Sequence, residues 1–385
     1  MSRKKIAVVF GTRPDTIKMA PVILELRKEA ESLDIVTIAT AQHRQMLDQV
    51  LQVFQIVPDH DLNVMKPKQT LAEITKNVID ALDQVLVVEK PDMVLVQGDT
   101  TTTFVGSLAA FYRGIPVGHV EAGLRTNDRA NPFPEEINRR LTSTMTDLHF
   151  APTSTSRKAL LRENVDPAHI FVTGNTVIDA LKIAVRKEYA FSVPELNEIA
   201  ARQKRLILVT MHRRENWGEP MAAAARALRR IAERHPEAQV VFPVHLNPIV
   251  RDVVAPILQN VPNILMIQPL DYLDFVNLMA RSYLVVTDSG GVQEEGPSLG
   301  KPIMVLREVT ERPEAVKYGT VKLVGLDEER IVRTAHRLLS DAKAYRAMAT
   351  ATNPYGDGRA ARRTVDVIKH HFGFTRRLPK DFSPR

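Results

Sequence analysis

Carboxylate side chains that could transfer protons stand directly after predicted strands in the first half of the chain. Asp99 follows the apolar run 92–97, and Glu121 follows the run 115–120. Glu135 opens the next predicted helix, in a segment rich in acids and arginines. An unpaired carboxylate beside a buried strand is costly, so each of these groups needs a partner or a catalytic role. General acid–base chemistry uses such carboxylates, with pKa values set by burial and neighbours.

Each carboxylate also has a structural interpretation. Asp99 could cap the helix that begins in the threonine run 100–103, because Asp and Thr are good helix caps. Glu121 could pair with Arg125, and the stretch 119–140 could be a solvated loop of mixed charge. Four consecutive threonines exceed what one cap needs, which favours a functional interpretation of Asp99.

In the second half of the chain, cationic residues take the corresponding places. His212 is followed by Arg213 and Arg214 at a predicted strand end, and His245 stands at the end of the next strand. A lone histidine is usually structural, but a cationic trio at a strand end resembles an anion site. The two histidines lack the spacing of a helical zinc motif, so no metal site is predicted.

A glycine turn after a later strand has the features of a phosphate cradle. Ser289, Gly290 and Gly291 lie between that strand and a helix, where backbone amides can approach an anion. One turn later, Glu294 or Glu295 could accept hydrogen bonds from both hydroxyls of a ribose. Phosphate and ribose features together point to a nucleotide or a nucleotide sugar.

The first predicted strand also leads into a candidate anion site. Gly11 permits a tight turn, and Arg13 and Lys18 bracket the start of a helix whose N-terminal amides favour anions. The segment has neither the dinucleotide-binding fingerprint nor the P-loop fingerprint. No nicotinamide or other cofactor is therefore predicted.

Strand-length apolar runs alternate with helical patterns from one end of the chain to the other. In the helical segment 72–90, the side chains that share one face are those of Ile74, Val78, Leu82 and Val85. The alternation predicts an α/β protein with two Rossmann-like parallel-sheet domains facing an interdomain cleft, where the strand ends would bind ligands. The strands are predicted at residues 5–10, 34–40, 92–97, 115–120, 148–152, 205–212, 238–245, 263–268, 283–289 and 301–307, and further helices at 219–235 and 272–282.

The composition narrows the class of protein. At 385 residues, 44% hydrophobic and 25% charged, the chain fits two soluble domains, and no apolar run could span a bilayer. We expect a cytoplasmic protein without a membrane partner. The net charge of +7 would permit nucleic-acid binding. However, the basic residues are scattered and aromatic residues are only 5%, so nucleic-acid binding is not predicted. The absence of cysteine excludes disulfides and thiolate nucleophiles.

Ten ordered motifs give the chain a recognisable resemblance. Between Ile6 and about Phe372 they include GTRPDTIKMAP, QHRQMLDQV, GDTTTTF, VGHVEAGLRT, PFPEEINRRL, TGNTVIDAL, HRREN, PVHLNP, DSGGVQEEGPSLGKP and TERPEAV. Together they closely resemble the bacterial non-hydrolysing UDP-N-acetylglucosamine 2-epimerases. The resemblance implies the GT-B fold, with an N-terminal domain at 1–174 joined by a C-terminal helix at about 364–385, and a UDP-binding domain at 175–363.

The resemblance also implies a reaction. Enzymes of this family interconvert UDP-N-acetylglucosamine and UDP-N-acetylmannosamine by eliminating UDP, through 2-acetamidoglucal, and adding UDP back. Neither a cofactor nor a metal is needed, and a homodimer is expected. The product supplies bacterial surface polysaccharides. Many members are activated by a second molecule of UDP-N-acetylglucosamine.

The residues that the resemblance implies fall into three sets. The catalytic set is Asp99, Glu121, Glu135 and His212. The UDP-binding set is Arg13, Lys18, His212, Phe275, Ser289, Gly290, Gly291 and Glu295. The activator set is Gln42, Gln45, Lys68, Glu135, Arg213 and His245. The chain departs from the family pattern at Lys68, where arginine is common, and at Gln97 and Asp15. A lysine cannot form the bidentate phosphate contact of an arginine, which puts the activator site in question.

Three alternatives to the epimerase remain. A glycosyltransferase of the same fold would need an acceptor site, and three carboxylates around one position would be surplus. A hydrolysing 2-epimerase would release UDP and free N-acetylmannosamine. A non-catalytic UDP-sugar-binding regulator would have no use for the four catalytic residues. The assignment of base and acid among the carboxylates stays open, because it depends on geometry.

Overall fold

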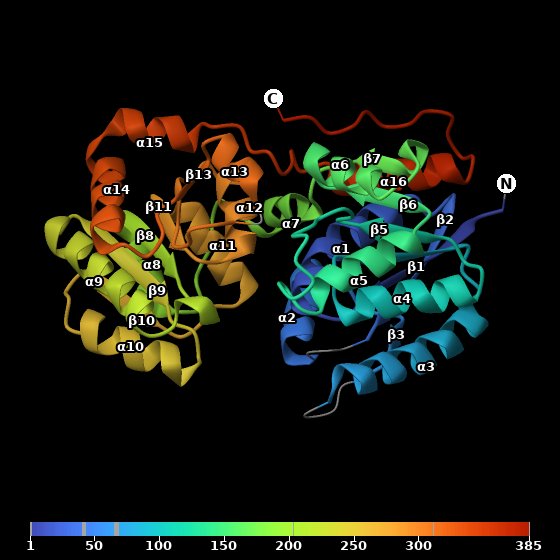
Figure 1. Cartoon of the computed structure of the whole chain (residues 1–385), viewed down its shortest axis with the longest axis horizontal. Coiled ribbons are helices and arrows are strands. Elements are labelled where there is room, and N and C mark those ends of the chain that lie inside the picture. The colour runs from blue at the N-terminus through green and yellow to red at the C-terminus, as the bar shows by residue number, and fades with distance from the viewer. Residues whose placement is uncertain (1, 41–43, 65–68, 203, 311, 385) are drawn as a thin grey trace. The chain divides into compact units, whose positions relative to one another are not determined.

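The computed structural model describes residues 2–40, 44–64, 69–202, 204–310 and 312–384, without the side chains of residues 44–46. The chain divides into two compact units, the first made of residues up to Lys182 with Tyr355–Pro384, and the second of Ile183–Pro354. Each unit is a parallel-sheet α/β domain, as predicted (Figure 1). Within the described ranges, no helix is long and apolar enough to cross a membrane.

The sheet of the first unit has seven parallel strands in the order β3-β2-β1-β4-β5-β6-β7. The five strands predicted in this half are present, each starting or ending within two residues of the predicted limits. The two-residue β3 and the three-residue β7 were not predicted, because each is too short to show a periodic pattern. The strands are β1 (Lys4–Phe10), β2 (Leu33–Ala39), β3 (His60–Asp61), β4 (Met93–Gln97), β5 (Val117–Val120), β6 (Leu148–Ala151) and β7 (Ile170–Val172).

Helices connect these strands, and α3, α4 and α5 lie side by side along one face of the unit (Figure 1). Helix α3 confirms the predicted apolar face, since Ile74, Val78 and Leu82 are buried and Val85 packs against the same core. The helices are α1 (Arg13–Arg27), α2 (Arg44–Phe54), α3 (Leu71–Glu89), α4 (Thr101–Tyr112), α5 (Glu135–Thr144), α6 (Ser154–Arg162), the 3-10 turn η1 (Pro167–His169), α7 (Thr176–Ala184) and α16 (Ala360–His371).

The C-terminal segment packs onto the first unit. Helix α16 contacts α1, and Asp179 caps it by accepting hydrogen bonds from the amides of Ala360 (3.1 Å) and Ala361 (2.9 Å). The C-terminal helix expected at about 364–385 is therefore shifted and shorter, and residues 374–384 contain no helix. This tail is held in place, because the amide of Phe382 donates to the carbonyl of Val172 in β7 at 2.6 Å.

The sheet of the second unit has six parallel strands in the order β10-β9-β8-β11-β12-β13. The five predicted strands are present, and the three-residue β13 was not predicted. The strands are β8 (Arg205–Thr210), β9 (Ala238–Pro243), β10 (Ile264–Ile267), β11 (Leu284–Thr287), β12 (Ile303–Val305) and β13 (Val321–Leu323). The helices are α8 (Pro194–Ala201), the 3-10 turn η2 (Arg214–Asn216), α9 (Glu219–Arg234), α10 (Pro248–Leu258), α11 (Tyr272–Arg281), α12 (Gly290–Ser298), α13 (Pro313–Lys317), α14 (Glu328–Ser340) and α15 (Ala342–Ala349).

Each sheet has one point at which the chain changes its direction of travel across the sheet. In the first unit this switch point lies between β1 and β4, and in the second between β8 and β11. Open α/β sheets bind ligands outside the carboxyl ends of the strands at such points. The residues that follow these four strands are therefore the first place to look for function.

Candidate functional site

The threonine run after Asp99 serves the packing of the first switch point. Thr100 caps α4, with its side chain accepting from the Thr103 amide at 3.3 Å. Thr102 lies against the turn after β1, where a Cβ atom on Gly11 would come within 2.6 Å of the threonine hydroxyl. Asp99 is thus not the helix cap, and its carboxylate is left for other partners.

The partner of Asp99 is Arg139 of α5. The Arg139 guanidinium lies 2.6 Å from the carboxylate through one nitrogen and 2.9 Å through Nε, and it also contacts Glu136 at 3.2 Å. The side-chain amide of Asn138 donates to the backbone carbonyl of Asp99 at 2.9 Å. Helix α5 thus contacts both the side chain and the backbone of Asp99. The Asp99 side chain keeps 25% of its surface exposed, so it is positioned and still accessible.

Glu121 is buried at the end of β5 in a left-handed backbone conformation (φ 66°), and it is 7% exposed. Its carboxylate lies 2.5 and 2.6 Å from the ammonium group of Lys18. The amides of Gln97 and Asn175 also donate to it, the latter at 3.1 Å. A left-handed conformation is uncommon outside glycine and is a mark of functional sites.

The structural alternative, in which Glu121 pairs with Arg125, is wrong. Arg125 instead binds Glu163, at 2.8 and 2.7 Å, and the hydroxyl of Ser143. Lys18, which was expected among the UDP-binding cations, is the residue that neutralises Glu121. Lys18 lies one to two turns into α1, and this helix brings its ammonium group to the end of β5.

Glu135 is the first residue of α5, and its Oε2 atom is buried without a hydrogen-bond partner among the described residues. It stands four residues before Arg139, so the two share a helix face, and Arg139 carries this face to Asp99. The neighbouring Glu136 is fully buried and accepts hydrogen bonds from the amides of the preceding loop, which is a structural role. The stretch 119–140 is therefore not a solvated loop throughout.

The turn after β1 is organised by a buried acid. Asp15 accepts hydrogen bonds from the amides of Gly11 (3.0 Å) and Thr12 (2.7 Å), and burial raises its pKa to about 6. Arg13 is the first residue of α1 and is half-buried. The amides of Gly11 and Thr12 are therefore already paired with Asp15. An anion bound at this turn would depend on the side chain of Arg13.

His212 and Asp288 meet at the switch point of the second unit. Asp288 follows β11 and is fully buried, while the imidazole of His212 after β8 is 42% exposed. The carboxylate lies 3.0 Å from His212 Nδ1 and accepts from the amides of His212 (3.0 Å) and Arg213 (2.9 Å). Burial would raise the pKa of Asp288, but the hydrogen bond and charge of His212 and the two amides hold it below its usual value.

Two further predicted residues surround this pair. The ring of His245, after β9, stacks on that of His212 with centroids 6.1 Å apart. Burial and the neighbouring His212 lower the pKa of His245. The Nε of Arg213 donates to the backbone carbonyl of Asp288 at 2.9 Å. The second unit thus gathers three of the predicted residues at one edge of its sheet.

The glycine turn begins at the next residue. Ser289 is the N-cap of α12, which starts at Gly290, where a Cβ atom would come within 2.6 Å of the Arg312 guanidinium. Glu294 pairs with the same arginine at 2.6 Å and is buried. Of the two acids considered for a ribose, Glu294 therefore has a structural partner. Glu295 is 7% exposed in the same helix.

The remaining predicted residues are scattered or lie outside the described part of the chain. Phe275 is half-buried in α11, and Gly291 is exposed in the first turn of α12. Gln45 lies in the first turn of α2, and its side chain is not described. Gln42 and Lys68 fall outside the described residues. Among the residues that are described, no cluster of three acids or histidines could hold a metal ion.

Sequence reasoning missed three residues that hold the predicted ones. Arg139 and Asn175 contact Asp99 and Glu121 from positions 40 and 54 residues away, and no local pattern announces such contacts. Asp288 was hidden by a boundary error, because the strand predicted at 283–289 contained it, whereas β11 ends at Thr287 and Asp288 follows it directly. The glycines beside it drew the interpretation to the turn instead.

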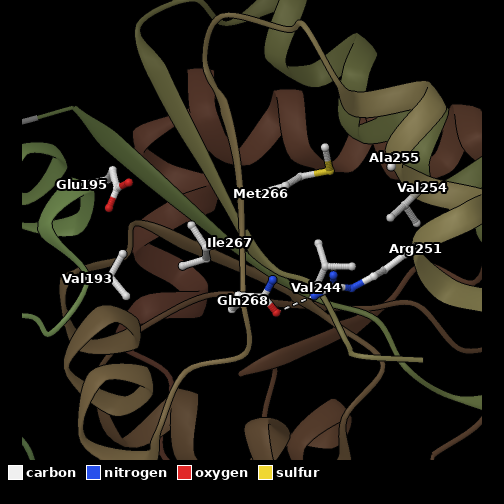
Figure 2. Close-up of a pocket in the computed structure, with 9 residues that line it drawn as sticks. All are labelled: Val193, Glu195, Val244, Arg251, Val254, Ala255, Met266, Ile267 and Gln268. Atoms are coloured by element: carbon white, nitrogen blue, oxygen red, sulfur yellow. Dashed lines mark hydrogen bonds between the residues drawn. The ribbon is translucent and has the colours of Figure 1, made fainter. Parts of the chain in front are cut away.

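A pocket with a volume of about 440 Å³ lies at another edge of the second unit (Figure 2). Met266 and Ile267 of β10 line it with Val254 of α10, and Arg251 donates to Gln268 at 2.6 Å. It contains no predicted site residue. Its lining is mostly aliphatic, and it lacks the paired carboxylates and histidines found at the two switch points.

Comparison with known proteins identifies the family. The family model described as UDP-N-acetylglucosamine 2-epimerase matches residues 25–369. The UDP-N-acetylglucosamine 2-epimerase of Bacillus subtilis is 54% identical over 383 residues, with full coverage of both chains, and that of Escherichia coli is 54% identical over 95% of this chain and 99% of its own.

Solved structures agree with the sequence comparison. The UDP-GlcNAc 2-epimerase from Neisseria meningitidis, crystallised with UDP-GlcNAc, superposes with a TM-score of 0.85 at 49% identity, covering 94% of this chain and 99% of its own. Both sheets and both switch points described above belong to the shared GT-B fold. The chain therefore belongs to the UDP-N-acetylglucosamine 2-epimerase family.

Proposed function

We propose that the protein interconverts UDP-N-acetylglucosamine and UDP-N-acetylmannosamine by inverting the C2 carbon of the sugar. One observation carries the proposal beyond family membership. The first unit places carboxylates on fixed cationic and amide partners at its switch point, while the second unit places exposed imidazole and arginine groups beside a glycine turn. Proton transfer requires the first arrangement, and binding of a diphosphate requires the second.

The proposed first step is the elimination of UDP. The bond between C1 and the phosphate oxygen breaks, and its electron pair leaves with UDP. A carboxylate takes the C2 proton, and the C2–H electron pair forms the C1–C2 double bond of 2-acetamidoglucal. His212, Arg13 and the amides after Ser289 are the groups that would stabilise the negative charge on the departing diphosphate.

The second step is the reverse addition on the other face of C2. A carboxylic acid donates a proton to C2, and UDP attacks C1. Two carboxyl groups are needed, since one proton leaves one face and another arrives at the opposite face. Glu121 is our candidate for one of them, because Lys18 and two amides hold its carboxylate rigidly. Asp99 and Glu135, joined through α5, supply the second.

The reaction class is tested by incubating the protein with UDP-N-acetylglucosamine alone and following the products by proton and phosphorus NMR. We expect the manno epimer to appear with the diphosphate bond to the sugar intact. Accumulation of UDP with free N-acetylmannosamine would instead establish the hydrolysing reaction. Turnover that appears only with an added acceptor would establish a glycosyltransferase, and tight UDP binding without turnover would establish a regulator.

We also propose activation by a second UDP-N-acetylglucosamine. Arg213 and His245 support it, since both lie at the sheet edge that holds His212 and both are partly exposed. The test is to start the reaction from pure UDP-N-acetylmannosamine. A lag that disappears on adding a trace of UDP-N-acetylglucosamine is expected. Immediate linear turnover from the manno epimer would contradict activation.

A homodimer is proposed through the ends of α3 and α4. Val88, Phe111 and Tyr112 are 75%, 60% and 68% exposed on these adjacent helices, and such an apolar patch marks an interaction surface. Phe111→Glu should convert a dimer to a monomer in light scattering, whereas Val309→Glu, at an exposed valine of the second unit, should not. An unchanged mass for both variants would locate the interface elsewhere.

The cytoplasmic location and the supply of surface polysaccharides are proposed from the family resemblance alone.

A further inference from the structure

Asp288 is a buried carboxylate that the proposed reaction does not use directly. It follows β11 with no exposed surface, at the strand that borders β8 at the switch point. Beyond the contacts with His212 and Arg213, it accepts a hydrogen bond from the side-chain amide of Asn216 at 3.1 Å. All of these partners belong to the single loop that follows β8. A buried charge with this many donors fixes the loop.

The contact with the imidazole has a chemical consequence. An ionised carboxylate accepts hydrogen bonds only, so His212 Nδ1 must carry a proton to face it at 3.0 Å. The Nε2 atom then points away from Asp288, on a side chain that is 42% exposed. In the neutral ring Nε2 would be an acceptor, and in the imidazolium it is a donor with a positive charge.

The other neighbours of the His212 ring do not place a second charge against it. His245 stacks on it with a lowered pKa, so the stacked neighbour is neutral near pH 7 and adds no competing charge. The guanidinium of Arg213 is directed to the Asp288 backbone carbonyl and to Glu215. Asp288 is therefore the charged group in contact with the His212 ring among the described residues.

We propose that Asp288 is a positioning residue of the reaction: it fixes the Nδ1-protonated form of His212 and thereby directs Nε2 to the diphosphate of the substrate. Asp288 itself touches no substrate atom. Asp288 also immediately precedes Ser289 in the sequence. Its contact with His212 therefore fixes the distance between the imidazole and the glycine turn. This inference rests on the proposed function for the role of the diphosphate, but the state of the His212 ring does not depend on it.

The test combines one spectrum with one mutant cycle. Nitrogen NMR of the wild-type protein, labelled at histidine and assigned with His212→Gln, reports which ring nitrogen carries the proton. We expect Nδ1 to be protonated at neutral pH without substrate. The cycle measures kcat for Asp288→Asn, for His212→Gln and for the double variant. Asp288→Asn alone should lower kcat by about 10- to 100-fold, the usual effect of losing an orienting carboxylate.

A positioning role makes the two substitutions non-additive. With His212 already replaced, Asp288→Asn should change kcat by less than about twofold. An equal loss in both backgrounds would overturn the proposal and leave Asp288 a purely structural residue. Asn263→Ala is the matched control, since it removes three buried hydrogen bonds elsewhere in the second unit and should lower stability without altering kcat.

The spectrum keeps the proposal testable if Asp288→Asn does not fold. An unprotonated Nδ1 in the wild-type protein would overturn it without any variant. If the wild-type protein forms no epimer while Nδ1 is protonated, the proposed function fails and the assignment of the ring state stands. The two failures are thus distinguishable.

Discussion

The two switch points of this protein use opposite electrostatic arrangements. In the first unit, cations support carboxylates: Lys18 lies against Glu121 and Arg139 against Asp99. In the second unit, a buried carboxylate supports hydrogen-bond donors, as Asp288 contacts the imidazole of His212 and the backbone amide of Arg213. In the Arg139–Asp99 and Asp288–His212 pairs the more buried group contacts a more exposed partner, whereas in the Lys18–Glu121 pair the carboxylate is the more buried member. This difference is the basis of our proposal that one unit moves protons and the other holds an anion.

The histidines show the same contrast. His119 and His149 are paired neighbours inside the first sheet, and burial lowers their pKa values to about 4 and about 3. His212 and His245 stand at strand ends of the second sheet with exposed rings. A histidine inside a sheet contributes packing as a neutral ring. A histidine at a strand end can change its protonation state and meet a ligand.

The largest effect should come from removing the best-supported carboxylate. Glu121→Gln keeps the shape of the side chain and one acceptor oxygen but can no longer take a proton, so kcat should fall by about 10³-fold. UDP should still bind with an unchanged Kd, because the anion-binding residues of the second unit are untouched. The measurements are steady-state kinetics and calorimetric titration with UDP. Lost UDP binding with an intact fold would show that Glu121 is a binding residue.

The next effect tests the cation behind that carboxylate. Lys18→Met leaves the 7% exposed Glu121 without its ammonium partner, and breaking a buried pair costs about 3 kcal/mol of unfolding free energy. Urea unfolding measures this cost. The double variant Lys18→Met with Glu121→Gln should recover much of the loss, because no charge is then left buried. A double variant as unstable as Lys18→Met would mean that lysine packing, and not charge, sets the cost.

A smaller effect tests the neutral histidines. The folded pKa of His149 is below the unfolded value of about 6.5, so the unfolded chain takes up the proton first and stability falls as pH drops below 6.5. Between pH 7 and pH 5 this group should cost about 2 kcal/mol of unfolding free energy. His149→Leu should therefore lose about 2 kcal/mol less than the wild type over this range. The unfolding free energies of both proteins are measured by urea unfolding at the two pH values. If the wild type and His149→Leu lose the same unfolding free energy, a neutral buried His149 is contradicted.

The smallest effect belongs to a carboxylate outside both switch points. Asp179→Ala removes the acceptor for the first amides of α16 and should lower stability by about 1 kcal/mol, the typical value of a helix cap. Asp179→Asn retains an acceptor oxygen and should lose less. Activity should be unchanged in both variants. A loss of turnover at full stability would bring Asp179 into the functional set and weaken the contrast between the units.

The sequence allowed the sheets to be predicted well, because buried parallel strands are uninterrupted apolar runs. The shortest strands were not predicted, because β3, β7 and β13 have two or three residues each, too few for a periodic pattern. The C-terminal tail was also misjudged, because its attachment depends on contacts of Asp381 and Phe382 with β7, whose residues are more than 200 positions away in sequence. Such a contact depends on tertiary structure and has no local signature.

The strand-end residues were predictable one by one, but their partners were not. Position after a strand identified Asp99, Glu121 and His212, since the carboxyl ends of parallel strands share one edge. The partners Lys18, Arg139 and Asp288 lie from 40 to more than 100 residues away in sequence, as in the 103-residue separation of Lys18 and Glu121. The nearby Arg125 was considered as a partner for Glu121, and the observed partner, Lys18, comes from α1. Burial and pairing, which set the chemistry, became visible only with the fold.

The central claim is that carboxylates of the first unit exchange the proton at C2, and one measurement tests it directly. The protein is incubated with UDP-N-acetylglucosamine in deuterated water, and the epimer is analysed by proton NMR and mass spectrometry. We predict one deuterium in UDP-N-acetylmannosamine, located at C2, and about 10³-fold slower formation of this product by Glu121→Gln. Epimer that retains its original hydrogen at C2 would contradict proton exchange and, with it, the account of both units.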